Sequence, residues 1–115
     1  MDLRTLVVDD EQLAREELCF QLEQLGGVEV VGQAANGVEA IEALERLRPD
    51  IVFLDIQMPG LTGLEVAQGI EGRTRVVFVT AYDQYALQAF DVHALDYLLK
   101  PFSGTRFRRA LQRVR

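Results

Sequence analysis

Three short apolar runs, each with the composition of a buried strand, end abruptly in a charged side chain, and this pattern narrows the folds open to the chain. The runs are residues 6–8, 51–54 and 98–99, and the charged residues that follow them are Asp9 with Asp10, Asp55, and Lys100. If the strands are parallel, their carboxyl ends meet at one edge of a sheet. Three carboxylates and one ammonium group are then expected to converge there. Lys100 is the only lysine, all other basic residues being arginine, which indicates a need for a compact point charge at this strand end.

Apolar runs of strand length alternate with amphipathic stretches of helix length, the pattern of a doubly wound α/β fold. Strands are predicted at about 4–8, 28–34, 51–54, 76–79 and 97–99. Helices are predicted at about 11–25, from a cap at Asn36 to Pro49, from a cap at Thr62 to about 70, at 83–92 and from about 103. This alternation predicts a flavodoxin-like (βα)5 fold whose five-stranded parallel sheet has the order 2-1-3-4-5. Ligands bind such sheets where the strand order reverses, between the first and third strands, where the three aspartates lie.

The composition indicates one cytoplasmic domain spanning residues 1–115. A length of 115 residues is enough for a single core. The net charge of −6 argues against nonspecific nucleic-acid binding. No apolar run approaches the roughly 20 residues that a membrane span needs, so no membrane partner is expected. A single cysteine, Cys19, and an amino-terminus without a secretion signal fit a reducing cytoplasm.

The expected cluster of acids has a definite chemistry. Three adjacent carboxylates repel one another unless a cation joins them, and an all-oxygen set without histidine or thiol favours Mg²⁺, with Mn²⁺ as a substitute. A carboxylate can also attack phosphorus and form an aspartyl phosphate. Lys100 and the hydroxyl of Thr80, which closes the strand 76–79, would then neutralise the oxygens of the transferred group.

Four separated segments resemble the receiver domain of two-component response regulators. They are LVVDDEQ, DIVFLDIQMPGLTGLEV, VVFVTAY and DYLLKPF, and together they cover essentially the whole chain. The stretch AYDQYALQAFDVHALDYLLKPF most resembles receivers of the LytR/AlgR type, whose usual output is a LytTR DNA-binding domain. The resemblance places any such output domain beyond Arg115. It implies a signalling domain for transcription regulation, rather than a metabolic enzyme, that catalyses its own phosphorylation and dephosphorylation.

The resemblance also implies roles for single residues. A sensor histidine kinase would phosphorylate Asp55, and the metal ligands would be Asp9, Asp10, Asp55 and the main-chain carbonyl of Gln57. Lys100 becomes the phosphate partner, joined to Pro101 by a cis bond. Thr80 and Tyr97 become the switch residues.

Two surfaces follow from this interpretation. The kinase is expected to dock around the mouth of the site, on Leu13, Ala14, Glu17, Pro101 and Phe102. Phosphorylation is expected to create a homodimer through Tyr85, Asp96, Arg106, Arg109 and Arg113. The arginines at 106, 109 and 113 share one helical face. This face is either exposed to solvent or paired with Asp91 or Asp96 of a second copy. Direct contact with DNA is disfavoured because no recognition-helix pattern accompanies the arginines. The apolar helix at 83–92 is either a partner surface or core.

Three other classes of protein fit less well. A haloacid dehalogenase-type hydrolase expects a second aspartate where Gln57 stands, and a cap domain. A flavodoxin needs a phosphate-binding loop where the sequence has Asp9-Asp10-Glu11. A degenerate receiver acting only as a binding module is disfavoured because every catalytic position is filled. Gly60 and Gly63 are expected to let the loop after Asp55 turn sharply, and His93 to end its helix in the left-handed region.

Overall fold

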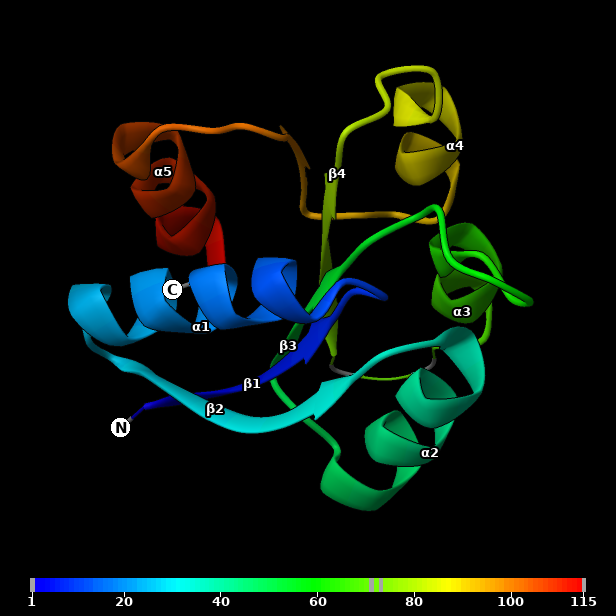
Figure 1. Ribbon diagram of the computed structural model, residues 1–115, viewed down its shortest axis with the longest axis horizontal. Helices are drawn as coiled ribbons and strands as arrows, with labels where there is room; N and C mark the ends of the chain where they lie inside the picture. The colour runs from blue at the N-terminus through cyan, green and yellow to red at the C-terminus, as the bar shows by residue number, and fades with distance from the viewer. Residues whose placement is uncertain (1, 71, 73, 115) are drawn as a thin grey trace.

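The computed structural model describes residues 2–70, 72 and 74–114, which form a five-stranded parallel sheet covered by helices on both faces (Figure 1). The strands are β1 (Leu3–Val8), β2 (Val28–Ala34), β3 (Ile51–Leu54), β4 (Arg75–Thr80) and β5 (Asp96–Leu99). Their order is β2-β1-β3-β4-β5, and every neighbouring pair is parallel. The predicted flavodoxin-like topology is confirmed.

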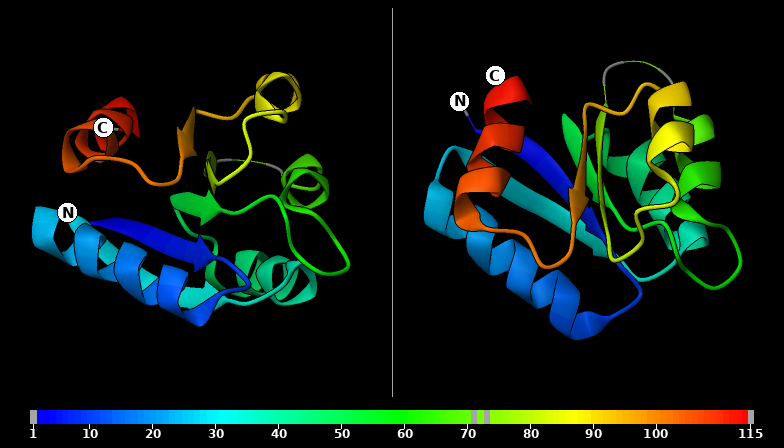
Figure 2. Two further views of the ribbon diagram at one scale, coloured as in Figure 1. Left: turned by 45° about the horizontal axis from the view of Figure 1, so that its top comes forward. Right: turned by 90° about the horizontal axis from the view of Figure 1, so that it is seen from above.

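Four helices connect the strands, a fifth follows β5, and together they form the two outer layers. They are α1 (Gln12–Leu25), α2 (Gly37–Leu47), α3 (Gly63–Gln68), α4 (Ala86–Asp91) and α5 (Gly104–Val114). Helices α1 and α5 cover one face of the sheet, whereas α2, α3 and α4 cover the other (Figures 1 and 2). Among the described residues, no helix is both long enough and apolar enough to cross a membrane.

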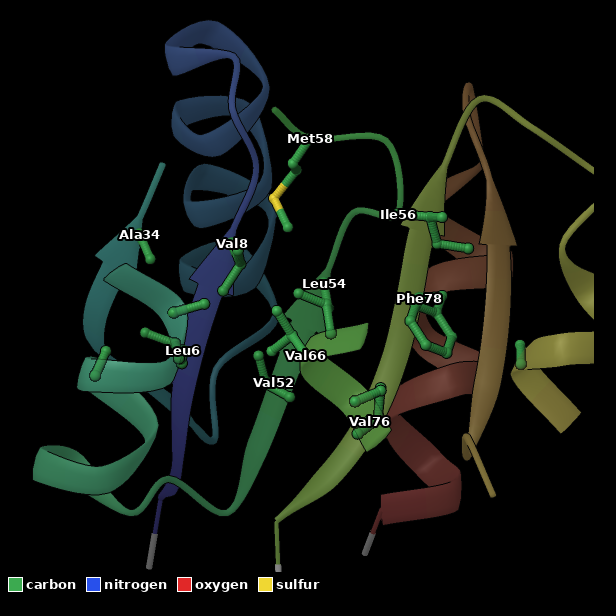
Figure 3. Close-up of a cluster of buried hydrophobic side chains, with 14 residues drawn as sticks. Leu6, Val8, Ala34, Val52, Leu54, Ile56, Met58, Val66, Val76 and Phe78 are labelled. Atoms are coloured by element: carbon green, nitrogen blue, oxygen red, sulfur yellow. The ribbon is translucent and has the colours of Figure 1, made fainter. Parts of the chain in front are cut away.

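The central strand β3 is buried on both faces, as its uninterrupted apolar run predicts. Val52 and Leu54 belong to the core cluster under α2 and α3, which Figure 3 shows in close-up. Phe53 points to the opposite cluster, where its ring lies 5.4 Å from that of Phe107 in α5. Burying side chains of this size stabilises the fold by about 1.5–3 kcal/mol each. The two cores therefore clamp β3, and with it the residue that follows β3, in a rigid position.

Two of the helices begin at the capping residues that the sequence predicts. The Asn36 side chain accepts a hydrogen bond from the Glu39 amide at 2.9 Å. Thr62 and Glu65 form a reciprocal capping box at the start of α3. Each cap satisfies amide groups that the first helical turn leaves without partners, a contribution of about 1 kcal/mol.

Helix α4 is shorter than the predicted range of 83–92, because it begins only at Ala86. The segment before it forms a turn in which the Ala86 amide donates to the Asp83 carbonyl at 3.4 Å. The carbonyl of Tyr82 accepts a hydrogen bond from the Tyr97 hydroxyl and is held toward β5. After α4, His93 has a φ of 60°, which confirms the predicted left-handed helix end.

Candidate functional site

The backbone of the sheet carries the charged residues past the strand ends into one site. The Asp9 amide donates to the Ala34 carbonyl at 3.1 Å, and the Asp55 amide donates to the Val8 carbonyl at 3.0 Å. The Lys100 amide likewise donates to the Thr80 carbonyl at 2.8 Å. Because these bonds continue the sheet by one residue, the functional side chains are fixed by backbone geometry.

The three predicted acids lie together as expected. Asp9, Asp10 and Asp55 each offer a carboxylate oxygen within 4.8 Å of the others. Asp9 and Asp55 are buried, while Asp10 is exposed at the mouth. A cleft of about 460 Å³ opens at this point; its lining includes Asp10, Asp55, Gln57, Tyr82 and Lys100. A set of hard oxygen ligands beside an open cleft fits Mg²⁺, which binds through one or two carboxylates and keeps several waters.

Lys100 bridges the two buried acids. Its Nζ atom lies 2.6 Å from Asp9 Oδ2 and 3.5 Å from Asp55 Oδ2. Burial by itself lowers the pKa of Lys100, but the hydrogen bond to Asp9 and the charge of Asp55 outweigh it and raise the pKa above its ordinary value. The ammonium group therefore stays charged, and it is held closer to Asp9 than to the proposed phosphoacceptor.

The environment of Asp55 favours its protonated form more than water does. Burial is the largest cause of its raised pKa, and the nearby Asp9 acts in the same direction. The Lys100 charge, the Ile56 amide and the Thr80 hydroxyl act in the opposite direction without cancelling the rise. The Ile56 amide donates to Asp55 Oδ1 at 2.7 Å. A cation at this site would stabilise the ionised carboxylate.

The predicted switch residues lie on the β4 and β5 side of the site. Thr80 is fully buried, and its hydroxyl oxygen lies 3.4 Å from the Tyr82 amide. The Tyr97 ring is half-buried 6.2 Å from Phe78, and burial raises the pKa of its hydroxyl. Lys100 and Pro101 are joined by a cis bond, as the resemblance implies.

Sequence reasoning missed Arg15 as a support of the acid pair. Its Nη1 donates to the Asp9 carbonyl at 2.7 Å from the first turn of α1, and the Glu11 amide donates to Asp9 Oδ1 at 2.9 Å. Both bonds hold the turn between β1 and α1. The only signal in the sequence is an arginine one helical turn after the acids, which is too common a pattern to single out.

The two loop glycines have different roles. Gly60 has a φ of 78° and turns the loop, as predicted. The turning role expected for Gly63 is wrong, because Gly63 is the first residue of α3. A Cβ atom there would lie 2.0 Å from the Asp55 carbonyl oxygen and 2.9 Å from its carbonyl carbon. Gly63 instead allows α3 to pack directly against the backbone of Asp55.

The residues expected to bind a kinase differ in exposure, and none of them is among the residues that line the cleft. Leu13 is 79% exposed on the first turn of α1, and Glu17 is exposed one turn later. Ala14 is half-buried and Pro101 is exposed. Phe102 is half-buried, with its ring 5.4 Å from that of Phe107 in the core.

The residues expected at a dimer surface do not all lie free. Asp96 is buried and accepts two hydrogen bonds from Arg106 of the same chain, at 2.8 and 2.6 Å. Arg113 lies 3.8 Å from the same carboxylate. Burial acts to raise the pKa of Asp96, but the bonds from Arg106 and the Tyr97 amide outweigh it and lower the pKa. Asp96 and Arg106 therefore tie α5 to β5, whereas Arg109 and the half-buried Tyr85 remain on the surface.

Comparison with known proteins agrees with this fold. The family model of the response regulator receiver domain matches residues 5–112. The chain is 50% identical over 115 residues to the transcriptional regulatory protein BtsR of Salmonella typhi, covering 98% of this chain and 48% of BtsR. It is 52% identical over 114 residues to an uncharacterized response regulatory protein of Yersinia pestis, covering 97% of this chain and 48% of that protein. The chain thus spans about half the length of these curated relatives.

Solved structures of response regulator domains have the same fold. The response regulatory domain of mrkE from Klebsiella pneumoniae superimposes with a TM-score of 0.91 at 33% identity, covering 97% of this chain and 94% of that one. The receiver domain of the putative response regulator NarL from Mycobacterium tuberculosis has a TM-score of 0.89 at 36% identity, covering 96% and 94%. The chain belongs to the receiver domains of two-component response regulators, which are signalling domains.

The close approach of Gly63 to Asp55 leads to a testable prediction. Gly63→Ala is expected to lower the free energy of unfolding by about 1–3 kcal/mol, because the new methyl group meets backbone that cannot move aside. It should also weaken Mg²⁺ binding by displacing Asp55. Urea unfolding and calorimetric titration measure the two effects. Gly69→Ala in the same region is the control, since its Cβ would lie 3.6 Å from its nearest neighbour, an ordinary contact; equal behaviour of the two variants would contradict the prediction.

Proposed function

We propose that this domain accepts a phosphoryl group on Asp55 from a sensor histidine kinase and that the modified domain controls an output module. The observation that carries the proposal is the convergence of Asp55 with two further carboxylates and one lysine at the open end of the sheet. If Lys100 served only to form a structural ion pair, a single carboxylate would be sufficient to pair with it. The surplus of negative charge beside a cleft supports a site for a cation and a phosphoryl group.

Mg²⁺ is the proposed cofactor, with Mn²⁺ as a substitute. Its ligands would be Asp9, Asp10, Asp55 and the main-chain carbonyl of Gln57. When bound, the ion supplies positive charge that offsets the repulsion among the carboxylates and the phosphoryl oxygens. The exposed position of Asp10 at the mouth of the cleft supports entry of a hydrated ion.

The side chains of the domain account for the transfer itself. A carboxylate oxygen of Asp55 attacks phosphorus and forms the P–O bond, while the P–N bond of the kinase phosphohistidine breaks and its electron pair stays on the imidazole. Lys100, whose Nζ lies 3.5 Å from Asp55 Oδ2, and the Thr80 hydroxyl, which acts on the same carboxylate, would bind the phosphoryl oxygens on Asp55. In dephosphorylation, water attacks phosphorus, the P–O bond to Asp55 breaks, and inorganic phosphate leaves with the Asp55 carboxylate restored. The domain thus catalyses both its phosphorylation and its dephosphorylation.

The identity of the phosphoacceptor can be tested directly. With a small phosphodonor and Mg²⁺, intact mass should show one added phosphoryl group in the wild type. Asp55→Asn should abolish the addition, because the amide lacks the nucleophilic oxygen. Chelating the metal should suppress it in the wild type. Equal labelling of wild type and Asp55→Asn would refute the assignment.

We also propose that the kinase docks on the rim formed by the start of α1 and the segment after β5. The phosphohistidine must reach Asp55 through the cleft, so its carrier must contact the surrounding residues. Leu13 offers an apolar contact that is 79% exposed, and Glu17 on the same helix and Pro101, two residues after β5, are exposed as well.

Charge reversal on this rim should separate docking from chemistry. Glu17→Lys is expected to slow transfer from the cognate kinase by tenfold or more, which corresponds to a loss of about 1.4 kcal/mol in the binding free energy of the interface. Labelling by a small donor should stay unchanged. Glu29→Lys makes the same charge change on the exposed edge of β2 and should affect neither rate. Parallel loss of both rates in Glu17→Lys would count against docking at this position.

Phosphorylation is proposed to drive homodimerisation through α4, β5 and α5, with Tyr85, Asp96, Arg106, Arg109 and Arg113 on or beside the surface. Two side chains of the short helix α4 support it: Leu87 is 82% exposed and Phe90 is 81% exposed. Phosphate on Asp55 adds about −1.5 to −2 charges and would draw the Thr80 hydroxyl inward. Tyr97 would then leave the Tyr82 carbonyl and rotate into the space below α4. A two-fold related copy would cover the apolar face.

Sedimentation with and without beryllofluoride and Mg²⁺ tests the dimer. The wild type should associate only with the phosphoryl mimic. Phe90→Ala should weaken association at least tenfold, as expected for a large apolar side chain at an interface, while Phe20→Ala, an exposed aromatic side chain of α1, should not. Tyr97→Ala should also fail to dimerise. A wild type that stays monomeric at high concentration rules the dimer out.

The output is proposed to be transcription regulation in the cytoplasm through a LytTR DNA-binding domain of the LytR/AlgR type. The sequence of residues 81–102 supports this subtype, and several relatives at about 50% identity are transcriptional regulatory proteins of twice this length. DNA would be reached only through that further domain, since the receiver carries a net charge of −6.

A further inference from the structure

A side-chain hydrogen bond connects the loop after the phosphoacceptor to the start of α4. The Gln57 amide nitrogen Nε2 donates to the hydroxyl oxygen of Tyr85, 28 residues away in the sequence. Gln57 lies two residues after Asp55, and Tyr85 directly precedes α4. The bond therefore connects the β3–α3 loop to the start of α4. Helix α4 lies next to α3 in all three views of the fold (Figures 1 and 2). Thr80 and Lys100 take no part in it.

Contacts from the segment between β4 and α4, and through it from β5, hold Tyr85 in place. Its ring meets the ring of Tyr82 edge-on, with centroids 6.3 Å apart and an interplanar angle of 74°. The Tyr82 carbonyl in turn accepts the hydroxyl proton of Tyr97, whose ring packs 6.2 Å from Phe78 in the core. All three tyrosines of the chain thus form one connected group that ends at Gln57. This anchorage distinguishes the Gln57–Tyr85 bond from an isolated contact between two mobile surface side chains.

We propose that the Tyr85 hydroxyl is a positioning group for the metal-binding loop and that its bond to Gln57 couples metal occupancy to the position of α4. The inference rests on the proposed function, in which the main-chain carbonyl of Gln57 is a metal ligand. Holding the Gln57 side chain restricts the backbone of the same residue, so less freedom is lost when the carbonyl binds the ion. By linkage, an ion that favours the tied loop must also favour the α4 position that the tie requires.

The consequence is a second route from the site to α4. The switch through Thr80 and Tyr97 needs a phosphoryl group, whereas the Gln57–Tyr85 tie responds to the metal alone. Metal binding would then restrain the start of α4 before phosphorylation. Because Tyr97 holds the Tyr82 carbonyl, a rotation of Tyr97 would also loosen the anchorage of Tyr85. The two routes meet at the β4–α4 segment.

Three variants of the 115-residue protein isolate the tie. Tyr85→Phe removes the hydroxyl and keeps the ring contact with Tyr82, and Gln57→Met keeps the length of the side chain without its amide. Each is expected to weaken Mg²⁺ binding about two- to tenfold, the equivalent of one hydrogen bond. The double variant should be no weaker than either single one, because both remove the same bond. Gln24→Met is the matched control for Gln57→Met, since Gln24 is exposed on α1, does not line the cleft, and its side chain makes no hydrogen bond within the described part of the chain.

Amide hydrogen exchange supplies a readout that a general loss of stability would not reproduce. In the wild type and in Gln24→Met, Mg²⁺ should slow exchange in residues 86–91, and in Tyr85→Phe and Gln57→Met this slowing should disappear. Unchanged or tighter Mg²⁺ binding in Tyr85→Phe, additive losses in the double variant, or retained slowing would each overturn the tie and leave the proposed function standing. A wild type that binds no Mg²⁺ would overturn the proposed function and this inference with it.

Discussion

The arrangement of the site depends on one electrostatic constraint: two carboxylates, Asp9 and Asp55, are buried side by side at the edge of the sheet. Such a pair is unfavourable by itself, because each charge loses water and faces a like charge. Lys100 offsets this by placing its ammonium between them, nearer to Asp9. Asp55, at 3.5 Å from the ammonium nitrogen, is the more loosely paired of the two acids.

The remainder of the fold holds this unfavourable cluster in place. Backbone hydrogen bonds extend the sheet to Asp9, Asp55 and Lys100, and the two hydrophobic clusters clamp β3 from both faces. Gly63 lets the amino-terminus of α3 reach the Asp55 backbone. Rigid support of this kind keeps the carboxylates close despite their repulsion, which is what a preorganised site requires.

The α4 side of the molecule is built differently. Helix α4 is short, its outer side chains Leu87 and Phe90 are exposed, and its start is held by tyrosine contacts rather than by a capping side chain. On the other side of β5, the Asp96–Arg106 pair fixes α5 to the sheet. A segment with few buried contacts between two well-anchored elements is the part of a fold that moves at low cost. The proposed phosphorylation of Asp55 is therefore expected to change the position of α4 first.

The sequence by itself determined the strands, their order, the acid cluster, the helix caps at Asn36 and Thr62, and the left-handed His93. These features follow from local chemistry and from the rule that parallel strands end at one edge, so neighbouring residues suffice to predict them. Only the tertiary structure decided that Lys100 pairs more closely with Asp9 than with Asp55, that Asp96 is buried against Arg106, that Gly63 serves packing, and that Gln57 reaches Tyr85. These outcomes depend on contacts between side chains that are distant in the sequence, or between elements that pack against one another. A local sequence pattern does not contain the distances between such residues.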